Sequence, residues 1–374
     1  MKIRGAILEA SGAKRPYQES KPLKIADIEL EGPGSGEVLV KIAAAGLCHS
    51  DLSVIDGNRP RPTPMALGHE ASGIVEEVGP NVSTFAKGDH VVLVFVPSCG
   101  HCIPCSSGRP ALCEPGAAAN GAGTLLSGSR RLSKNGAMVH HHLGVSAFAE
   151  YATVSEHSLV KIDPEFDLTI AALFGCAVLT GVGAVVNTGQ VPPGSKVAVI
   201  GLGGVGLCSL LGAKVSGASQ VVAIDLNNNK LRLAKELGAT HAVNASDENA
   251  VEAIREITKG GVDFAFEMAG SVPALQLAYD ITTRGGTTIT AGLPHPDARL
   301  SLSPVSLVAE ERSLKGSYVG ACIPRRDLPR YMALYNKGDL AVDRLLSDVL
   351  KLEDINLGFE KLASGESIRQ VITF

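Results

Sequence analysis

Residues 197–207 read VAVIGLGGVGL, an apolar run followed at once by a glycine-rich segment. The run 197–200 is typical of a buried strand, and the glycines that follow allow a tight turn that opens a helix. Backbone N–H groups at the start of such a helix can approach a pyrophosphate closely. A turn that serves packing alone would look the same, so the motif by itself leaves both interpretations open. The glycines concerned are Gly201, Gly203, Gly204 and Gly206.

A second apolar run, QVVAID, supplies the context that the glycines need. It ends at Asp225, 19 residues beyond Gly206. A carboxylate at the end of this strand accepts hydrogen bonds from the adenosine ribose hydroxyls and repels a 2′-phosphate. The pair of runs therefore favours a dinucleotide site, and NAD over NADP. Lys230 would lie beside the same ribose, although a solvated helix lysine is an equal interpretation.

Around this motif, apolar runs alternate with helical patterns, as in a parallel βαβ sheet. Residues 178–320 are predicted to form a doubly wound α/β domain. Residues 1–177 carry short β-branched runs between Gly and Pro turns, which predict a β-rich domain. Within it, residues 114–147 lack a sustained period and are predicted to be a long surface loop. Residues 321–374 are predicted to hold one or two helices and a strand that returns to the first domain.

The composition limits the classes of partner. The chain has 374 residues and a net charge of −4, with no basic run, so neither nucleic acid nor an anionic membrane is an expected partner. The N-terminal residues lack the apolar segment of a secretory signal, and no run is long enough to span a membrane. We therefore expect a cytoplasmic protein that binds small molecules or itself. Its eight cysteines then suggest metal binding or catalysis rather than disulfides.

The stretch CGHCIPCSSGRPALC contains half of these cysteines in one short loop. Four thiolates at this spacing match a closed tetrahedral zinc cage. Iron–sulfur ligation also uses four cysteines, but its spacings differ and no proline follows the last one directly here. A redox C-x2-C pair is disfavoured because the neighbouring cysteines would sequester its thiols. The four residues are Cys99, Cys102, Cys105 and Cys113.

The hexapeptide GLCHSD at 46–51 is open to three interpretations: a metal site, a nucleophilic cysteine or a polar loop. Two thiolates, Cys48 and Cys176, together with His69 would leave a fourth zinc position open to water or substrate. These residues are far apart in the sequence, so buried structural side chains are the alternative. Cys208 and Cys322 are interpreted as small buried hydrophobic residues.

Six ordered motifs resemble the zinc-dependent medium-chain alcohol dehydrogenases, and the resemblance runs over nearly the whole chain. It implies a GroES-like catalytic domain, a Rossmann coenzyme domain, and a cleft between them that holds zinc and nicotinamide. Cys48, His69 and Cys176 would bind a catalytic zinc, and the four-cysteine loop a structural zinc. The motifs are GLCHSD, GHEASG, the four-cysteine loop, GCAVLTG, GLGGVGL with Asp225, and GESIRQVITF.

The resemblance also implies a mechanism. Zinc would lower the pKa of a bound alcohol, and hydride would pass to the nicotinamide. Glu70 would lie beside the metal and ligate it transiently, and Asp51 would accept from the second nitrogen of His69. Ser50 would move the substrate proton. Many relatives end this relay in a histidine where the chain has Ser53, so proton release is expected through water or His49.

Further coenzyme contacts are implied by matching positions, each of which could equally be an ordinary polar or packing residue. They are His49 and Arg369 at the pyrophosphate, Thr180 and Val205 beside the nicotinamide, and Gly292, Leu293 and Val319 near its carboxamide.

The substrate pocket is the least determined part of the resemblance. Phe95 would form an aromatic wall, whereas Arg59 and His142 occupy pocket positions that are frequently apolar or aromatic. A polar or carboxylate-bearing alcohol would suit them, but a solvated Arg59 is an equal interpretation. Ser50, smaller than threonine, leaves room for secondary alcohols. We therefore expect oxidation of primary or secondary alcohols, aromatic or allylic ones among them, and the reverse reduction.

Two other functions remain open at this point. One is a glutathione-dependent formaldehyde dehydrogenase, for which Arg130, Arg131 and Arg59 are the candidate binding groups. The other is a non-catalytic zinc- and dinucleotide-binding protein on the same fold. The resemblance further favours a homodimer, because residues 114–147 are present in longer dimeric relatives; a tetramer is the alternative.

Overall fold

The structure is a computed structural model that describes residues 1–374, and these divide into two compact units. The first unit comprises Met1–Cys176, Ile323–Pro329 and Asp343–Phe374. The second comprises Ala177–Cys322 and Arg330–Val342. Residues 330–342, which are predicted above to belong to the returning C-terminal segment, thus group with the second unit.

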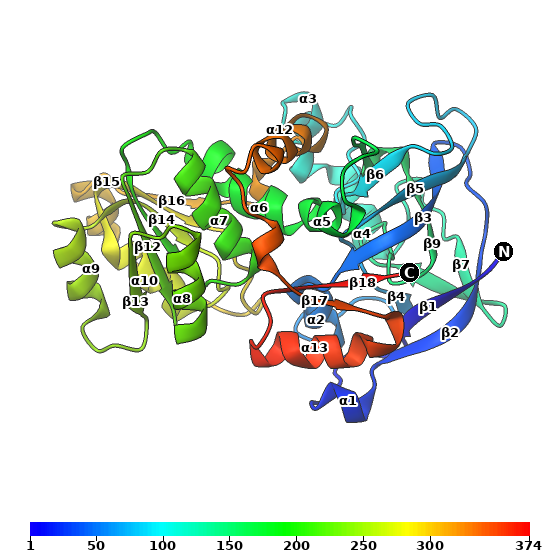
Figure 1. The fold of residues 1–374 in the computed structure, drawn as a ribbon, viewed down its shortest axis with the longest axis horizontal. Coiled ribbons are helices and arrows are strands. Elements are labelled where there is room, and N and C mark those ends of the chain that lie inside the picture. The colour runs from blue at the N-terminus through cyan, green and yellow to red at the C-terminus, as the bar shows by residue number, and fades with distance from the viewer. The chain divides into compact units, whose positions relative to one another are not determined.

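Two β-sheets form the first unit (Figure 1). Five strands close a barrel in the order β1 (Lys2–Leu8), β2 (Leu23–Leu30), β7 (Leu132–Lys134), β8 (Ala137–His141) and β4 (Met65–Ala66). The other sheet has the order β10 (Leu159–Lys161), β6 (His90–Leu93), β5 (Ala71–Val78), β3 (Glu37–Gly46), β18 (Arg369–Thr373) and β17 (Leu346–Leu350), with β9 (Tyr151–Ser155) paired to β3.

Strand β3 is the centre of the second of these sheets. Eight of its ten residues are buried, because β5, β9 and β18 all pair with it. The C-terminal strand β18 runs antiparallel to β3, with Val371 opposite Gly46. The predicted return of the last strand to the first domain is therefore observed. The helices of this unit are α1 (Tyr17–Ser20), α2 (His49–Ile55), α3 (Ile103–Ser106), α4 (Glu114–Ala122), α5 (Leu168–Ala172) and α13 (Ile355–Ser364).

The prediction of a surface loop over 114–147 is wrong. This segment contains helix α4 and strands β7 and β8, and its Leu125, Leu132 and Val139 are buried in the first unit. The two strands have three and five residues, which is too short to show a period. Their partners β2 and β4 lie far away in the sequence, so no local pattern reports the pairing.

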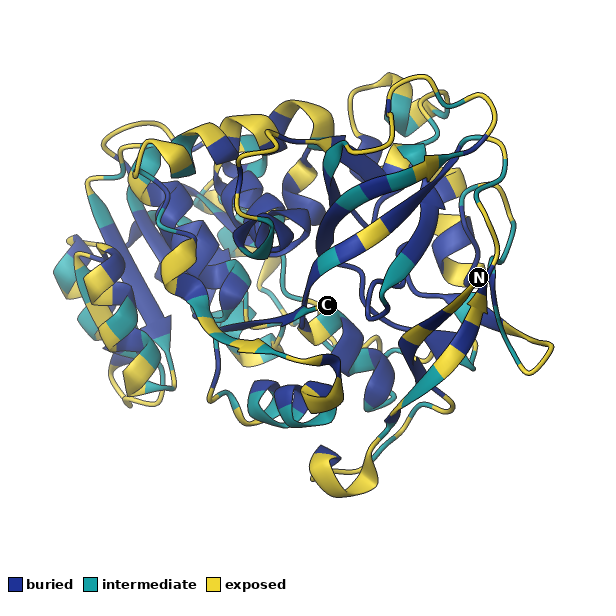
Figure 2. Ribbon diagram, turned by 45° about the vertical axis from the view of Figure 1, so that its right-hand side comes forward, coloured by how far each residue is buried: buried dark blue, intermediate teal, exposed yellow.

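The second unit is a parallel sheet in the order β13 (His241–Asn244), β12 (Gln220–Asp225), β11 (Lys196–Ile200), β14 (Val262–Glu267), β15 (Thr282–Thr290) and β16 (Ser313–Gly316). Apolar side chains of this sheet pack with those of α9 (Ala250–Thr258) and α10 (Val272–Ile281) in one core. Figure 2 shows the strands buried and the outward sides of the helices exposed. From β11 the chain adds β12 and β13 on one side, then returns to the other side of β11 with β14 and continues to β15 and β16. This reversal of strand order confirms the predicted doubly wound fold. Its other helices are α6 (Ala177–Gly183), α7 (Gly204–Val215), α8 (Asn228–Leu237) and α11 (Pro304–Ala309).

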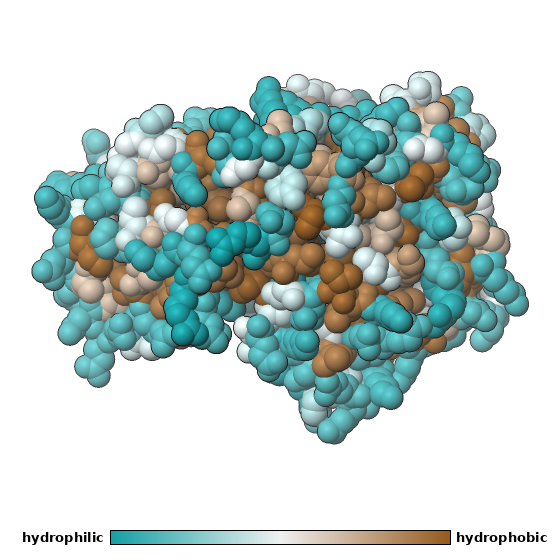
Figure 3. Space-filling model, in the orientation of Figure 1, coloured by the Kyte–Doolittle hydropathy of each residue, from teal (hydrophilic) through white to brown (hydrophobic).

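Helix α12 (Pro324–Asn336) spans a boundary between the units: its residues up to Pro329 belong to the first unit, and those that follow belong to the second. None of the helices taken alone has the length and apolar composition needed to cross a membrane. One bent pair of helical segments, Leu168–Gly175 with Ala177–Gly189, reaches that length and composition when the two are taken together. The face in Figure 3 carries hydrophilic side chains with apolar ones between them, as is usual at protein surfaces.

Candidate metal centre and coenzyme site

The stretch GLCHSD spans the end of β3 and the start of α2. Cys48 precedes the helix with an extended backbone, and Ser50 and Asp51 lie in the first helical turn. The Asp51 side chain is fully buried, whereas Ser50 is half-buried with its hydroxyl 3.8 Å from the Cys48 sulfur. The Ser53 hydroxyl donates to the Ser50 carbonyl at 2.9 Å. One short segment thus places a hydroxyl beside the Cys48 thiol and buries the Asp51 carboxylate.

Two other segments meet Cys48. Gly68, at φ +101°, turns the chain into His69, and a Cβ on Gly68 would lie 2.6 Å from the Phe148 nitrogen. Cys176 follows a short helical turn at the end of the first unit. The ligand atoms of the four buried side chains that gather here lie within 4.8 Å of one another. They are Cys48, His69, Glu70 and Cys176.

The chemistry of this group fits a zinc ion. Both ring nitrogens of His69 are buried without a hydrogen bond in the protein, and because Nδ1 faces Asp51 Oδ2 at 3.1 Å, Nε2 is the nitrogen left for a metal. Hydrogen bonding between the two thiols lowers the pKa of Cys48 and raises that of Cys176. A metal would displace the remaining thiol proton, because zinc binds thiolates. Cys48, His69 and Cys176 would hold the ion and leave one position for substrate or for Glu70.

Asp51 lies behind His69. Its Oδ2 is 3.1 Å from His69 Nδ1, and its Oδ1 accepts from the Gly68 N–H at 2.9 Å. Burial alone would raise the pKa of Asp51, but the charge of His69 and the neighbouring His142 outweigh it and hold the pKa below its usual range. The predicted contact between Asp51 and His69 is thus present, with the ring nitrogen opposite to Nε2 turned toward the carboxylate.

Glu70 forms a buried ion pair with Arg369. Burial raises the pKa of Glu70 to about 7, against the charge of Arg369, which lowers it. The Glu70–Arg369 ion pair results from the pairing of strands. Gly46 of β3 lies opposite Val371 of β18, and its N–H donates to the Glu70 carbonyl at 2.8 Å. The predicted contact of Arg369 with a pyrophosphate stays a prediction, and the contact observed is with Glu70.

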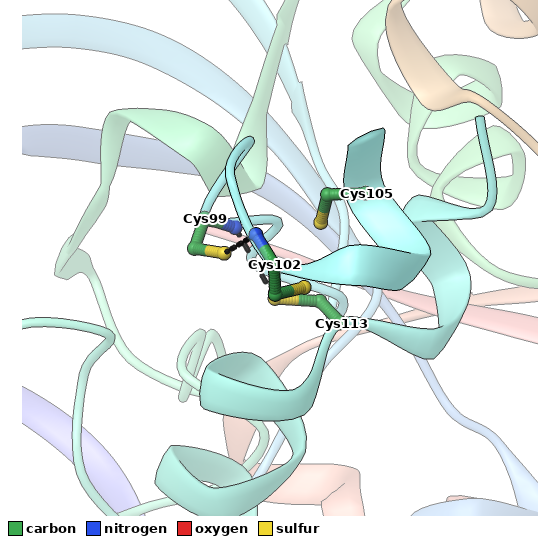
Figure 4. A group of neighbouring side chains, drawn as sticks. All are labelled: Cys99, Cys102, Cys105 and Cys113. Carbon is green, nitrogen blue, oxygen red and sulfur yellow. Dashed lines mark hydrogen bonds between the residues drawn. The ribbon is translucent and has the colours of Figure 1, made fainter. Parts of the chain in front are cut away.

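The four-cysteine loop forms a second cluster, with sulfur atoms within 4.8 Å of one another (Figure 4). Backbone N–H groups of Cys99 and Gly116 point to the Cys113 sulfur at 3.2 and 3.3 Å, and the N–H of Cys102 points to the Cys99 sulfur at 3.3 Å. Such contacts stabilise thiolates, as a metal cage requires. Cys105 lies in α3, and Cys113 is the N-cap residue directly before α4, so these helices position two of the four sulfur ligands.

The glycine turn opens α7 in the second unit, as predicted. Gly201 has φ +87°, and a Cβ there would lie 2.6 Å from the Ala269 nitrogen. A Cβ on Gly206 would lie 1.8 Å from the Gly201 oxygen. At Gly203 a Cβ would meet nothing within 4 Å, so the protein itself does not require this glycine. The open space beside Gly203 fits the close approach of a pyrophosphate.

Asp225 ends β12 with both carboxylate oxygens held. Oδ2 accepts from the Leu202 N–H at 2.6 Å, and Oδ1 from the Asn227 N–H at 2.8 Å. These bonds fix the position of the carboxylate at the end of the strand beside the glycine turn.

The remaining predicted residues lie in both units. The second unit holds Thr180, Val205, Lys230 and Gly292, which are half-buried, Leu293, which is exposed, and Val319, which is buried at φ +50°. In the first unit, His49 is exposed, Arg59 is half-buried, and the buried Phe95 ring meets His69 edge-on with centroids 5.1 Å apart. His142 is buried, and its Nδ1 lies 3.1 Å from Asp51 Oδ1. Neither this contact nor the Glu70–Arg369 pair was predicted, and only the run HHH at 140–142 hinted at the first.

Two family models cover most of both units. One described as an alcohol dehydrogenase GroES-like domain matches residues 34–164, and one described as a zinc-binding dehydrogenase matches residues 204–337. The S-(hydroxymethyl)glutathione dehydrogenase of Synechocystis sp. is 39% identical over 368 residues, which cover 97% of this chain and 100% of that protein. The chain belongs to the zinc-dependent medium-chain alcohol dehydrogenase family.

Solved structures agree with this assignment. An alcohol dehydrogenase zinc-binding domain protein of Burkholderia ambifaria has 36% identity to the chain and a TM-score of 0.94, over 100% of this chain and 99% of that one. The benzyl alcohol dehydrogenase of Acinetobacter calcoaceticus has 34% identity and a TM-score of 0.93 at the same coverage. This protein is therefore a zinc-dependent alcohol dehydrogenase that uses NAD(P), with GroES-like and Rossmann domains as predicted. The non-catalytic alternative is not favoured.

Proposed function

We propose that this alcohol dehydrogenase oxidises alcohols whose carbinol carbon carries an aromatic or allylic group, with NAD as the hydride acceptor. The observation that carries the proposal is the position of Phe95. Its ring is buried and meets the edge of the ligand His69, so an aromatic surface adjoins the metal site. Aromatic substrates pack favourably on such a ring. The similarity to a benzyl alcohol dehydrogenase supports the same class.

The residues of the metal centre have distinct roles in this reaction. When bound, zinc would polarise the alcohol oxygen and the nicotinamide would accept hydride. Cys48, His69 and Cys176 would hold the metal, and Asp51 would keep the Nδ1 proton of His69 in place. The Ser50 hydroxyl, beside the Cys48 sulfur, would accept the alcohol proton. Because Ser53 donates to a backbone carbonyl, we expect the proton to leave Ser50 through water or His49.

NAD is the proposed coenzyme because of Asp225. Its two backbone hydrogen bonds fix a carboxylate where the adenosine ribose would lie. The negative charge would bind the ribose hydroxyls and repel a 2′-phosphate.

A glutathione adduct is a less suitable substrate, although one relative carries that name. Two of the three candidate arginines have defined partners within the protein. Arg131 pairs with Glu31 and Glu37, and Arg130 bonds His140 and a backbone carbonyl. Binding the glutathione carboxylates would break these contacts.

The test is a steady-state comparison of benzyl, allylic, linear primary, secondary and carboxylated alcohols, with formaldehyde plus glutathione included. We expect the highest kcat/KM for benzyl or allylic alcohols. Phe95→Leu should lower the preference for benzyl over linear alcohols, because the aromatic surface is lost. Phe85→Leu removes a similarly buried ring that packs near Arg325 and is the matched control. A highest rate with formaldehyde and glutathione, or an unchanged preference in Phe95→Leu, would contradict the proposal.

We also propose a homodimer. Strand β16 is the outer strand of its sheet, and next to it in the sequence α11 exposes Val305 and Val308, at 72% and 80%. An unpaired edge strand with apolar neighbours is suited to pair with a second copy. Light scattering should give twice the chain mass of 38.7 kDa, and a tetramer or monomer mass would contradict this. A cytoplasmic location is proposed because thiolate ligands require reduced cysteines.

A further inference from the structure

His142 reaches the metal centre through the barrel strands. It follows β8, which runs parallel to β4, and β4 leads directly toward Gly68 and His69. The backbone N–H of His142 donates to the Ser146 hydroxyl at 2.9 Å and to the Ala66 carbonyl at 3.2 Å. Its side chain is buried. The same strand pair therefore fixes the positions of both histidines.

Both histidines face one carboxylate. The Nδ1 atom of His142 lies 3.1 Å from Asp51 Oδ1, and the Nδ1 atom of His69 lies 3.1 Å from Asp51 Oδ2. The two rings meet edge to face, with centroids 5.5 Å apart. An ionised carboxylate only accepts hydrogen bonds, so each of these nitrogens must carry a proton for a favourable contact. For His69, this tautomer leaves Nε2 bare.

We propose that His142 is a positioning residue for the catalytic metal: its Nδ1–H, together with the Gly68 N–H, holds Asp51 Oδ1 so that Oδ2 stays on His69. Without His142, Oδ1 keeps one donor and the carboxylate can rotate away from His69. His142 would then act on the metal through Asp51, rather than on the alcohol as a pocket residue. The proposal rests on the proposed metal-holding role of His69 and does not depend on which alcohol is oxidised.

Two substitutions separate the donor from the packing. In His142→Asn, the amide nitrogen can occupy the place of Nδ1 and still donate to Asp51. In His142→Gln, the longer side chain carries its amide near the place of Nε2, so the donor to Asp51 is misplaced. The readout is the rate at which zinc passes from the purified holoenzyme to a chromophoric chelator. The catalytic zinc is identified as the phase that parallels loss of NADH formation.

We expect catalytic zinc to leave His142→Gln about tenfold faster than the unmodified enzyme, and His142→Asn within about twofold, since outer partners of ligands typically change metal affinity by that order. The structural zinc phase should be unchanged in both variants. Equal rates in all three proteins would overturn the proposal. Equally fast release from both variants would do so too, because it would indicate packing alone. A protein without a releasable catalytic zinc would instead refute the metal-holding role itself.

Discussion

Gly206 and Gly203 of the coenzyme turn differ in the space around them, so we expect alanine at Gly206 to lower stability and alanine at Gly203 to weaken NAD binding. In Gly206→Ala the new Cβ would lie 1.8 Å from the Gly201 oxygen, whereas ordinary contact begins near 3.4 Å. The obstructing atom belongs to the backbone of the turn after β11, so strand and helix must separate. Overpacking of this kind costs about 1–3 kcal/mol, and the better helix propensity of alanine returns about 1 kcal/mol.

Gly203→Ala is the matched control. Its Cβ meets nothing within 4 Å, and its φ of −74° suits any residue. The cost is then limited to a poorer helix cap, about 1 kcal/mol or less. The new methyl group would, however, occupy the space in which the pyrophosphate approaches the backbone.

The assays are thermal unfolding of the coenzyme-free enzyme and titration calorimetry with NAD. Gly206→Ala should lower the Tm by up to about 4–8 °C, because the two contributions leave a net loss of up to about 2 kcal/mol. Gly203→Ala should change the Tm little and raise the Kd for NAD at least about tenfold, which is about 1.4 kcal/mol. A Gly203→Ala enzyme that binds NAD normally, or a Gly206→Ala enzyme of normal Tm, would refute this account of the turn.

Three further predictions concern single side chains. Cys102→Ser should lower the zinc content measured by metal analysis by one ion per chain and lower the Tm, while the catalytic zinc remains. Ser106→Ala of the same loop is the control and should leave the zinc content and the Tm unchanged. Retention of both zinc ions in Cys102→Ser would contradict a structural cage. Asp225→Ser should raise the KM for NAD about tenfold and lower that for NADP, and an unchanged ratio would show that the carboxylate does not select the coenzyme. Burial raises the pKa of Glu70 to about 7 from 4.5, so the folded metal-free protein binds the extra proton and its stability should fall as pH rises between these values. Glu70→Gln should flatten that slope in urea unfolding, and an identical slope would contradict the raised pKa.

The fold class could be predicted because its signals are local. The strand, the four glycines and Asp225 lie within 29 residues, and the four cysteines of the cage within 15. Short-range spacing of this kind reports directly on a turn or a metal loop. By contrast, β7 and β8 are short and pair with distant strands, so the segment 114–147 looked irregular in the sequence.

The proposed ligands of the catalytic metal were assigned in sequence only through resemblance, because Cys48, His69 and Cys176 are separated by 128 residues from first to last. Tertiary structure brings their donor atoms within 4.8 Å, Glu70 included. It also decides what surrounds them. Arg369 reaches Glu70 because β18 pairs with β3, and His142 reaches Asp51 because β8 pairs with β4. The sequence by itself thus determined the coenzyme turn and the cysteine cage, whose parts are neighbours along the chain. Only the tertiary structure decided which buried charges meet at the catalytic metal, because sheet pairing joins residues that no local spacing relates.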